Sequence, residues 1–121
     1  MPISEYNGLM ARAAAASDVF NAIAETHRRK ILDALVTGER PVGELVDELR
    51  LTQPQVSKHL RVLRDVELVH VRRSGRHMLY RTNAEVIRPL HEWTKTFERF
   101  WQHQLLRVKE RAESASKLQS D

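Results

Sequence analysis

The sequence predicts a mainly helical (α+β) domain that carries one two-stranded β-hairpin and ends in a long helix. Three observations support this fold class: a sharply capped helix begins after Thr52, the apolar period changes from helical to alternating after Val66, and apolar residues recur at helical spacing from Leu90 onward. A chain of 121 residues suits one compact domain. We expect that domain at residues 17–113, after a flexible arm at 1–16 and before a flexible tail at 114–121.

The capped helix, expected at residues 53–65, has the clearest local signal. Thr52 and Gln55 have the spacing of a capping box, and Pro54 lies in the first turn, where a missing backbone N–H costs nothing. Its apolar face holds Val56, Leu60 and Leu63. The rest of its surface carries amide, hydroxyl and cationic side chains that suit base edges and phosphates, namely Gln53, Gln55, Ser57, Lys58, Arg61 and Arg64.

Two amphipathic helices are expected upstream of residue 40. The first begins near Ser17, a plausible N-cap, and packs Val19, Phe20, Ile23 and Ala24. The second follows Thr26 and ends at a left-handed Gly38 cap. Its expected buried residues are Ile31, Leu32, Leu35 and Val36. Cations such as Arg28 stand at the unfavourable end of its dipole, so they are either solvated charge or phosphate contacts.

A third helix opens at Pro41, with Val42, Leu45, Val46 and Leu49 on its apolar side. Only Arg50 and Leu51 separate it from Thr52. Two short helices joined by so tight a turn, the second polar and basic outside, describe a helix-turn-helix in which the second helix reads DNA.

A β-hairpin is expected from residues 68–73 and 76–81 around a Ser74-Gly75 turn. That turn would place Val71 opposite Met78 and Val69 opposite Tyr80. The hairpin would form a wing over residues 70–79, with exposed arginines at its tip: Arg72, Arg73 and Arg76. Such arginines can enter a minor groove, although charged side chains also simply blunt edge strands.

The last helix is expected at about residues 83–113, opening with a second capping box from Thr82 to Glu85. Pro89 should kink it or break it into a short leader and a long main helix. One side is apolar and rich in aromatics: Leu90, Trp93, Phe97, Phe100, Trp101, Leu105 and Val108. A symmetric dimer commonly covers so wide a face. An intramolecular core stripe and a pocket for an apolar ligand are the alternatives.

Composition narrows the function classes. Between Gln53 and Arg81, seven Lys and Arg residues face two acidic ones, which indicates a polyanion-facing surface. The absence of cysteine rules out disulfides and thiolate metal sites. We also find neither an apolar run long enough for a membrane span nor a signal peptide, and expect a cytoplasmic protein. Without a cysteine nucleophile, a glycine-rich phosphate loop or a triad-like arrangement, an enzyme is not expected, and no cofactor is.

Four stretches together resemble the ArsR family of bacterial winged-helix repressors, over roughly Val19 to Tyr80. They are residues 24–32 (Ala-Glu-Thr-His-Arg-Arg-Lys-Ile-Leu), 42–45 (Val-Gly-Glu-Leu), 53–63 (Gln-Pro-Gln-Val-Ser-Lys-His-Leu-Arg-Val-Leu) and the arginine-rich hairpin. The aromatic last helix, with Phe100-Trp101, resembles the branch often encoded beside SRPBCC-type (START-like) proteins.

The resemblance implies a winged helix-turn-helix homodimer, built from the first and last helices, that represses by occupying a palindromic operator in double-stranded DNA. Phe20 would then join the dimer interface. By carry-over, base or phosphate contacts fall on Gln53, Gln55, Ser57, Lys58 and His59, and the wing contacts on Arg72, Arg73 and Arg76. His59 also adjoins Leu60 on the helix circumference, so it either contacts DNA or supports the helix. An unidentified small-molecule effector is a further implied partner.

Departures from the family pattern argue against metal sensing. Pro41 and Gly43 replace the Cys-x-Cys of arsenic- and antimony-sensing members. His91 and His103 are more than three turns apart and cannot chelate one ion within a chain, so no metal site is predicted. Arg50 and Glu67 stand where many members have Gly, and a left-handed cap at either would cost roughly 1 kcal/mol.

Three hypotheses follow from the sequence. The first is a dimeric DNA-binding repressor. The second is a zinc- or nickel-sensing repressor, with an ion that bridges two chains. The third is a protein-interaction winged helix whose basic face binds an acidic partner without reading DNA sequence.

Overall fold

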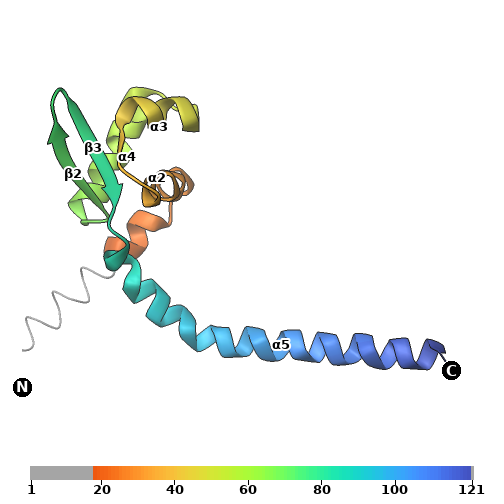
Figure 1. Ribbon diagram of the computed structural model, residues 1–121. Helices are drawn as coiled ribbons and strands as arrows, with labels where there is room; N and C mark the ends of the chain where they lie inside the picture. Colours follow the sequence, from red (N-terminus) through yellow and green to blue (C-terminus); the bar gives the residue numbers. More distant parts are fainter. Residues whose placement is uncertain (1–17, 121) are drawn as a thin grey trace, which may run out of the picture. The chain divides into compact units, whose positions relative to one another are not determined.

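The computed structural model describes residues 18–120, with side chains up to residue 118, and divides into one unit ending at Arg88 and another beginning at Pro89 (Figure 1). The expected arm at 1–16 and the Ser17 N-cap lie outside the described residues. After helical residues 18–23, the first unit contains α2 (Thr26–Val36), β1 (Arg40–Pro41), α3 (Val42–Leu49), α4 (Gln53–Asp65), β2 (Val69–Ser74), β3 (His77–Thr82) and the 3-10 helix η1 (Ala84–Ile87).

Helix α2 begins at a side-chain cap that the sequence analysis did not identify. The Glu25 carboxylate accepts a hydrogen bond from the backbone N–H of Arg28 at 2.8 Å, which satisfies one of the free donors of the first turn. The helix buries Ile31, Leu32 and Leu35 as expected, but Val36 is 58% exposed and the prediction that it is buried was wrong. The expected left-handed cap at Gly38 was also wrong, because the helix ends at Thr37 with a right-handed backbone.

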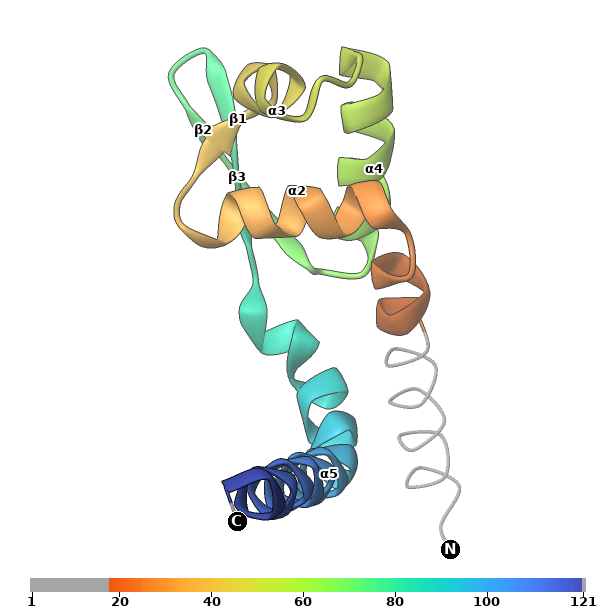
Figure 2. The ribbon, with the colours of Figure 1, turned by 90° about the vertical axis from the view of Figure 1, so that its right-hand side faces the viewer.

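Helices α3 and α4 form the expected helix-turn-helix, with a short turn between them (Figure 2). The capping box is confirmed: Gln55 N–H donates to Thr52 Oγ1 at 3.3 Å, and Thr52 N–H donates to Gln55 Oε1 at 2.9 Å. The α3–α4 turn passes through Arg50 in the left-handed conformation, with φ 56°. Glu67, which leads into the hairpin, has φ 64°.

Three antiparallel strands form the sheet in the order β1-β3-β2, so the short strand β1 extends the expected hairpin. Val71 pairs with Tyr80 and Ser74 with His77, which places the loop at Gly75-Arg76. The expected Ser74-Gly75 turn, with Val71 opposite Met78 and Val69 opposite Tyr80, was therefore wrong. Gly75 has φ 61° and Arg76 does not have positive φ, as a type II′ turn requires. Because the shift is two residues, each side chain keeps its face.

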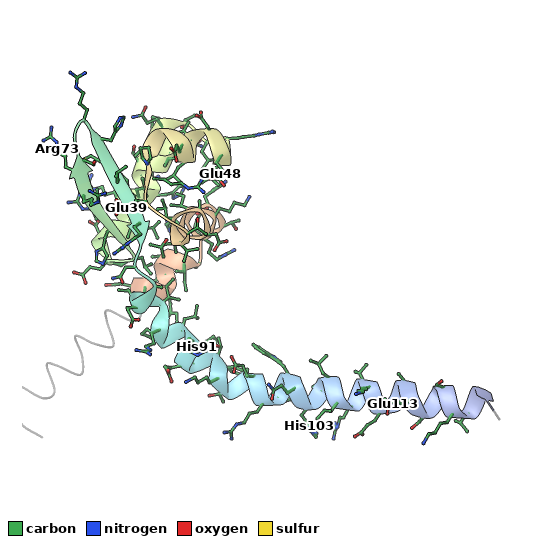
Figure 3. The ribbon with its side chains drawn as sticks, viewed as in Figure 1. Glu39, Glu48, Arg73, His91, His103 and Glu113 are labelled. Atoms are coloured by element: carbon green, nitrogen blue, oxygen red, sulfur yellow. The ribbon has the colours of Figure 1, made fainter. Side chains whose placement is uncertain are left out.

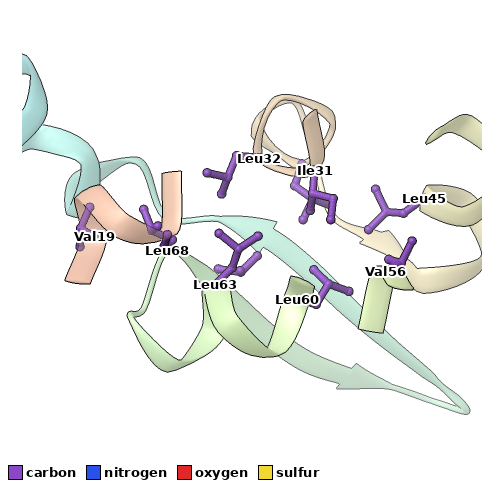
Figure 4. Close-up of a cluster of buried hydrophobic side chains, with 11 residues drawn as sticks. Val19, Ile31, Leu32, Leu45, Val56, Leu60, Leu63 and Leu68 are labelled. Carbon is purple, nitrogen blue, oxygen red and sulfur yellow. The ribbon is translucent and has the colours of Figure 1, made fainter. Parts of the chain in front are cut away.

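The core of this unit lies between α2, α3, α4 and the start of β2 (Figure 4). Ile31 and Leu35 of α2 and Leu45 of α3 are fully buried there. Helix α4 contributes Val56, Leu60 and Leu63, which confirms its predicted apolar face. Each such side chain contributes roughly 1.5–3 kcal/mol relative to exposure, so this core determines which side of α4 faces solvent.

The expected capping box from Thr82 to Glu85 is not formed. Thr82 is buried, and its Oγ1 donates to the Leu32 carbonyl of α2 at 2.8 Å, so it ties the end of β3 to that helix. Asn83 occupies the N-cap of η1 without a side-chain cap bond, and its Nδ2 donates to the Glu67 carbonyl at 3.0 Å. The Thr82 hydroxyl therefore bonds to α2 across the core and does not cap the following helix.

Helix α5 (Arg88–Ser120) forms the second unit apart from its first residue. Pro89 lies in its first turn, where proline is tolerated, so the break falls before it and η1 is the short leader. The helix continues through residues 114–120, where the sequence suggested a flexible tail. No described helix has both the length and the apolar character needed to cross a membrane.

We predict that Thr82→Val lowers the free energy of unfolding by about 1 kcal/mol, because it removes a buried hydrogen bond while keeping the shape of the side chain. Urea denaturation would measure the change. Thr37→Val makes the same chemical change at an exposed position and should stay within about 0.5 kcal/mol of the wild type. Equal effects of the two substitutions would contradict this role of Thr82.

We also predict that Glu67→Gly raises stability by roughly 0.5–1 kcal/mol, because glycine adopts a positive φ without the Cβ clash. Lys30→Gly, in the regular part of α2, should lower stability by a similar amount. Thermal denaturation of both variants gives the two signs. A loss of stability in Glu67→Gly would contradict the idea that the positive φ of Glu67 costs free energy that glycine removes.

Candidate nucleic-acid interface

The exposed side of α4 gathers six of the predicted DNA-contacting residues on one continuous surface. All six side chains are exposed, while the opposite side of the helix is buried in the core. They are Gln53, Gln55, Ser57, Lys58, Arg61 and Arg64. A helix with this division can enter a major groove without exposing any of the core.

Gln55 both caps α4 and exposes an amide group that was predicted to contact DNA. Its Oε1 accepts the Thr52 N–H in the capping box, so that oxygen is already committed within the protein. The side-chain NH₂ group of Gln55 takes no part in the capping box and can donate hydrogen bonds to another molecule. Gln55 can therefore offer donors to an acceptor on a base, while its capping bond holds the side chain in place.

The wing presents its exposed arginines near the turn, and Arg73, labelled in Figure 3, donates its Nε to the Gly75 carbonyl at 3.4 Å. Arg72 is not free: its Nε donates to Glu39 Oε2 at 2.6 Å, just before β1. The Arg72 side chain is 60% exposed, and an exposed ion pair contributes only about 0–1 kcal/mol, so a phosphate can replace Glu39 at low cost. Arg76 is exposed in the turn itself.

Helix α4 and strand β3 border a common depression of about 500 Å³. Arg61 and Arg64 contribute cationic groups to it, and Tyr80 contributes a ring from the wing strand. Asp65 also lines the depression, so the surface between α4 and the wing strand is polar but not uniformly basic.

Arg28, a predicted phosphate contact, is engaged in hydrogen bonds within the protein. Its Nε donates to the Ala22 carbonyl at 2.6 Å and its Nη2 to the Asn21 carbonyl at 3.3 Å. Arg29 similarly donates to the Ile23 carbonyl at 2.8 Å. These cations stand at the unfavourable end of α2, but they cap the carbonyl end of the preceding helical residues, where positive charge is favourable.

The His59 side chain is only 17% exposed and lies between the buried and the exposed sides of α4. Its Nδ1 atom is buried without a hydrogen-bond partner, 4.0 Å from Glu25 Oε2, and its ring centroid lies 5.7 Å from that of His27. Burial lowers the pKa of His59, Glu25 opposes that shift, and nearby Arg28, His27 and Lys58 add to it. His59 is therefore neutral near pH 7, which favours support over phosphate contact.

His27 and His59, which are far apart in the sequence, lie side by side in the structure. Glu25 completes this group. Burial would raise its pKa, but the Arg28 N–H and the two histidines outweigh that effect and lower it. His91 and His103 lie apart along α5, about 18 Å by the rise of a helix (Figure 3).

Helix α5 exposes a continuous aromatic surface. Trp93 is 59% exposed and its ring meets that of Phe97 edge-on, with centroids 5.2 Å apart; Phe97 in turn stacks on Trp101 at 6.4 Å. The other predicted interface residues of this helix are exposed as well, except Leu90, which is half-buried; Phe20 in the first unit is also half-buried. Leu106 and Leu118 are exposed apolar residues that the sequence analysis did not include.

Sequence comparison finds similarity to known transcriptional regulators over the helices and the wing described above. The family model described as "Bacterial regulatory protein, arsR family" matches residues 26–71, from α2 into the wing. The transcriptional repressor SdpR of Bacillus subtilis (strain 168) is 32% identical over 67% of this chain and 90% of its own length.

Two solved structures share the fold. An ArsR-like transcriptional regulator from Rhodococcus sp. RHA1 superposes with TM-score 0.64 at 23% identity, over 83% of this chain and 94% of its own. The homodimeric winged helix-turn-helix DNA-binding domain of a possible ArsR-family regulator from Mycobacterium bovis superposes with TM-score 0.63 at 28% identity, over 74% and 83%. The relatives are transcriptional regulators, and nothing in them indicates an enzyme. The chain therefore belongs to the arsR family of bacterial winged helix-turn-helix transcriptional repressors.

Proposed function

We propose that this repressor binds a palindromic operator as a homodimer, with α4 of each chain in a major groove and each wing against the minor groove or the backbone. The observation that carries this proposal is the two-sided character of α4. Its apolar residues Val56, Leu60 and Leu63 are buried, and its other side presents amides, a hydroxyl and cations that no other part of the described chain covers. A bacterial repressor of this kind acts on the chromosome, in the cytoplasm.

The exposed side chains of α4 divide into two chemical groups. Gln53, Gln55 and Ser57, near the start of the helix, can form hydrogen bonds with base edges. Lys58, Arg61 and Arg64 are suited to phosphates, whose contacts position the helix and make affinity depend on salt. Sequence selection should therefore depend on the first turns of α4, and overall affinity on its cations and those of the wing.

A dimer is proposed because one such helix is too small a surface for tight binding. Two copies related by a twofold axis would present reader helices to successive major grooves, about 34 Å apart. The aromatic side of α5 is the surface best suited to hold the copies together, since buried tryptophans dominate interface energies. The homodimeric Mycobacterium bovis domain supports this assembly by similarity.

We predict that Gln55→Glu folds normally but discriminates poorly between operator and scrambled DNA. Glutamate at this position preserves the capping box, whereas it lacks the NH₂ donors. The ratio of the two affinities should fall roughly tenfold or more, as for a lost base contact. Fluorescence anisotropy with DNA from the protein's own upstream region measures the ratio.

Lys58→Ala is the matched control for phosphate contact. It should weaken binding to both DNAs alike and reduce the slope of log affinity against log salt by about one. If Gln55→Glu keeps the wild-type ratio, Gln55 does not read bases. If the wild type itself does not discriminate, the protein-interaction hypothesis replaces the present one.

We further predict that Trp93→Ala and Trp101→Ala shift the protein toward monomers, because each truncation at an interface anchor costs about 2 kcal/mol or more. Sedimentation velocity at micromolar concentration gives the oligomeric state. Arg99→Ala, on the opposite side of α5, should leave the dimer intact. Wild-type protein that sediments as a monomer would contradict the proposed interface.

A further inference from the structure

Glu25, His27 and His59 form a side-chain group that the DNA interface does not use. Glu25 and His27 stand at the start of α2, and His59 comes from the middle of α4. One potential ligand atom from each residue lies within 4.8 Å of the other two. We propose that these three residues bind a divalent transition-metal ion, which would bridge α2 and the reader helix α4.

The distances fit such an ion with small side-chain movements. His27 Nδ1 lies 3.0 Å from Glu25 Oε1, and His59 Nδ1 lies 4.0 Å from Glu25 Oε2. Ligand atoms around a tetrahedral zinc ion, bound at about 2.0–2.1 Å, stand roughly 3.4 Å apart. The pair with Oε1 is therefore already close enough, and the pair with Oε2 must approach by less than about 1 Å. The third pair, between the two histidines, has ligand atoms within 4.8 Å of each other.

His59 supplies an independent observation. Its Nδ1 is a buried polar atom without a hydrogen-bond partner, which costs free energy unless something binds it. A metal ion would use that nitrogen directly. The outer members of the group are accessible, because the Glu25 side chain is 33% exposed and that of His27 is 45% exposed. An ion can therefore reach the site from solvent and keep a water molecule as its fourth ligand.

The ligand chemistry narrows the identity of the ion. Two imidazoles and one carboxylate suit zinc, cobalt or nickel, whereas soft ions such as Cu(I) prefer thiolates, which this chain lacks. Glu25 can keep its capping role, because Oε2 accepts the Arg28 N–H while the carboxylate has a second oxygen. Arg28 and Lys58 are nearby positive charges that weaken the binding of a dication, so we expect lower affinity than at a closed structural site.

Binding at this position would act directly on the DNA-reading element, which is an inference that rests on the proposed function. His59 is adjacent to Lys58 on α4, and Glu25 caps α2, so an ion would hold these two helices together. The site uses different residues from the histidines of α5, His91 and His103. It therefore differs from the ion bridging two chains that the sequence analysis considered.

The test is a Co²⁺ and Zn²⁺ titration of the untagged full-length protein, by absorption spectroscopy and competition with a chromogenic chelator. We expect one ion per chain and a visible absorption spectrum typical of a four-coordinate Co²⁺ ion. His27→Gln, which changes the most exposed ligand, should lower affinity roughly tenfold or more. The control variant His91→Gln/His103→Gln should bind like the wild type.

Two results would overturn the proposal: a wild type that binds no ion at micromolar concentration, or loss of the ion in the control variant with retention in His27→Gln. Operator binding measured with and without Zn²⁺ separates the two proposals. An ion without operator binding refutes the proposed function and leaves the site standing. If the protein binds the operator but binds no ion, the metal site is refuted and the proposed function stands. A Zn²⁺ effect on operator affinity in the wild type, absent in His27→Gln, would link them.

Discussion

The burial of one side of α4 is the constraint on which the rest of the structure depends. Val56, Leu60 and Leu63 are held in the core, so the helix cannot rotate about its axis, and its amide and cationic side chains must face solvent. The core in turn needs α2 and β3, which the Thr82–Leu32 hydrogen bond ties together. Helix α2 thus helps to fix which side of α4 faces solvent.

This arrangement explains why charges that look alike in the sequence have different roles. Arg28 and Arg29 are used to close the helix formed by residues 18–23, and Arg72 is paired with Glu39. The exposed cations of α4 have no comparable commitment to the protein backbone among the described contacts. The neighbouring acceptors, a free helix end for Arg28 and Arg29 and a carboxylate for Arg72, therefore decide which arginine side chains bond within the protein.

Much of this could be predicted from the sequence because it depends on local chemistry. The Thr52–Gln55 capping box, the apolar side of α4 and the break near Pro89 follow from residue types and spacing within a few positions. The left-handed turns at Arg50 and Glu67 were suggested by the family resemblance, since many members have Gly there. The hairpin register could not be predicted from local spacing, because Gly75 suits either of two adjacent positions in the turn. Tertiary contacts decided the rest: Thr82 bonds across the core, and His59 meets Glu25 and His27, which are far away in sequence.

In the proposed complex, two copies of α4 from one dimer read successive major grooves. Hydroxyl-radical footprinting of the wild-type protein on its own upstream DNA tests this most directly. We expect symmetric protected regions whose centres repeat at about 10 base pairs, one helical turn of DNA. A single protected region, or uniform weak protection that does not depend on sequence, would contradict it.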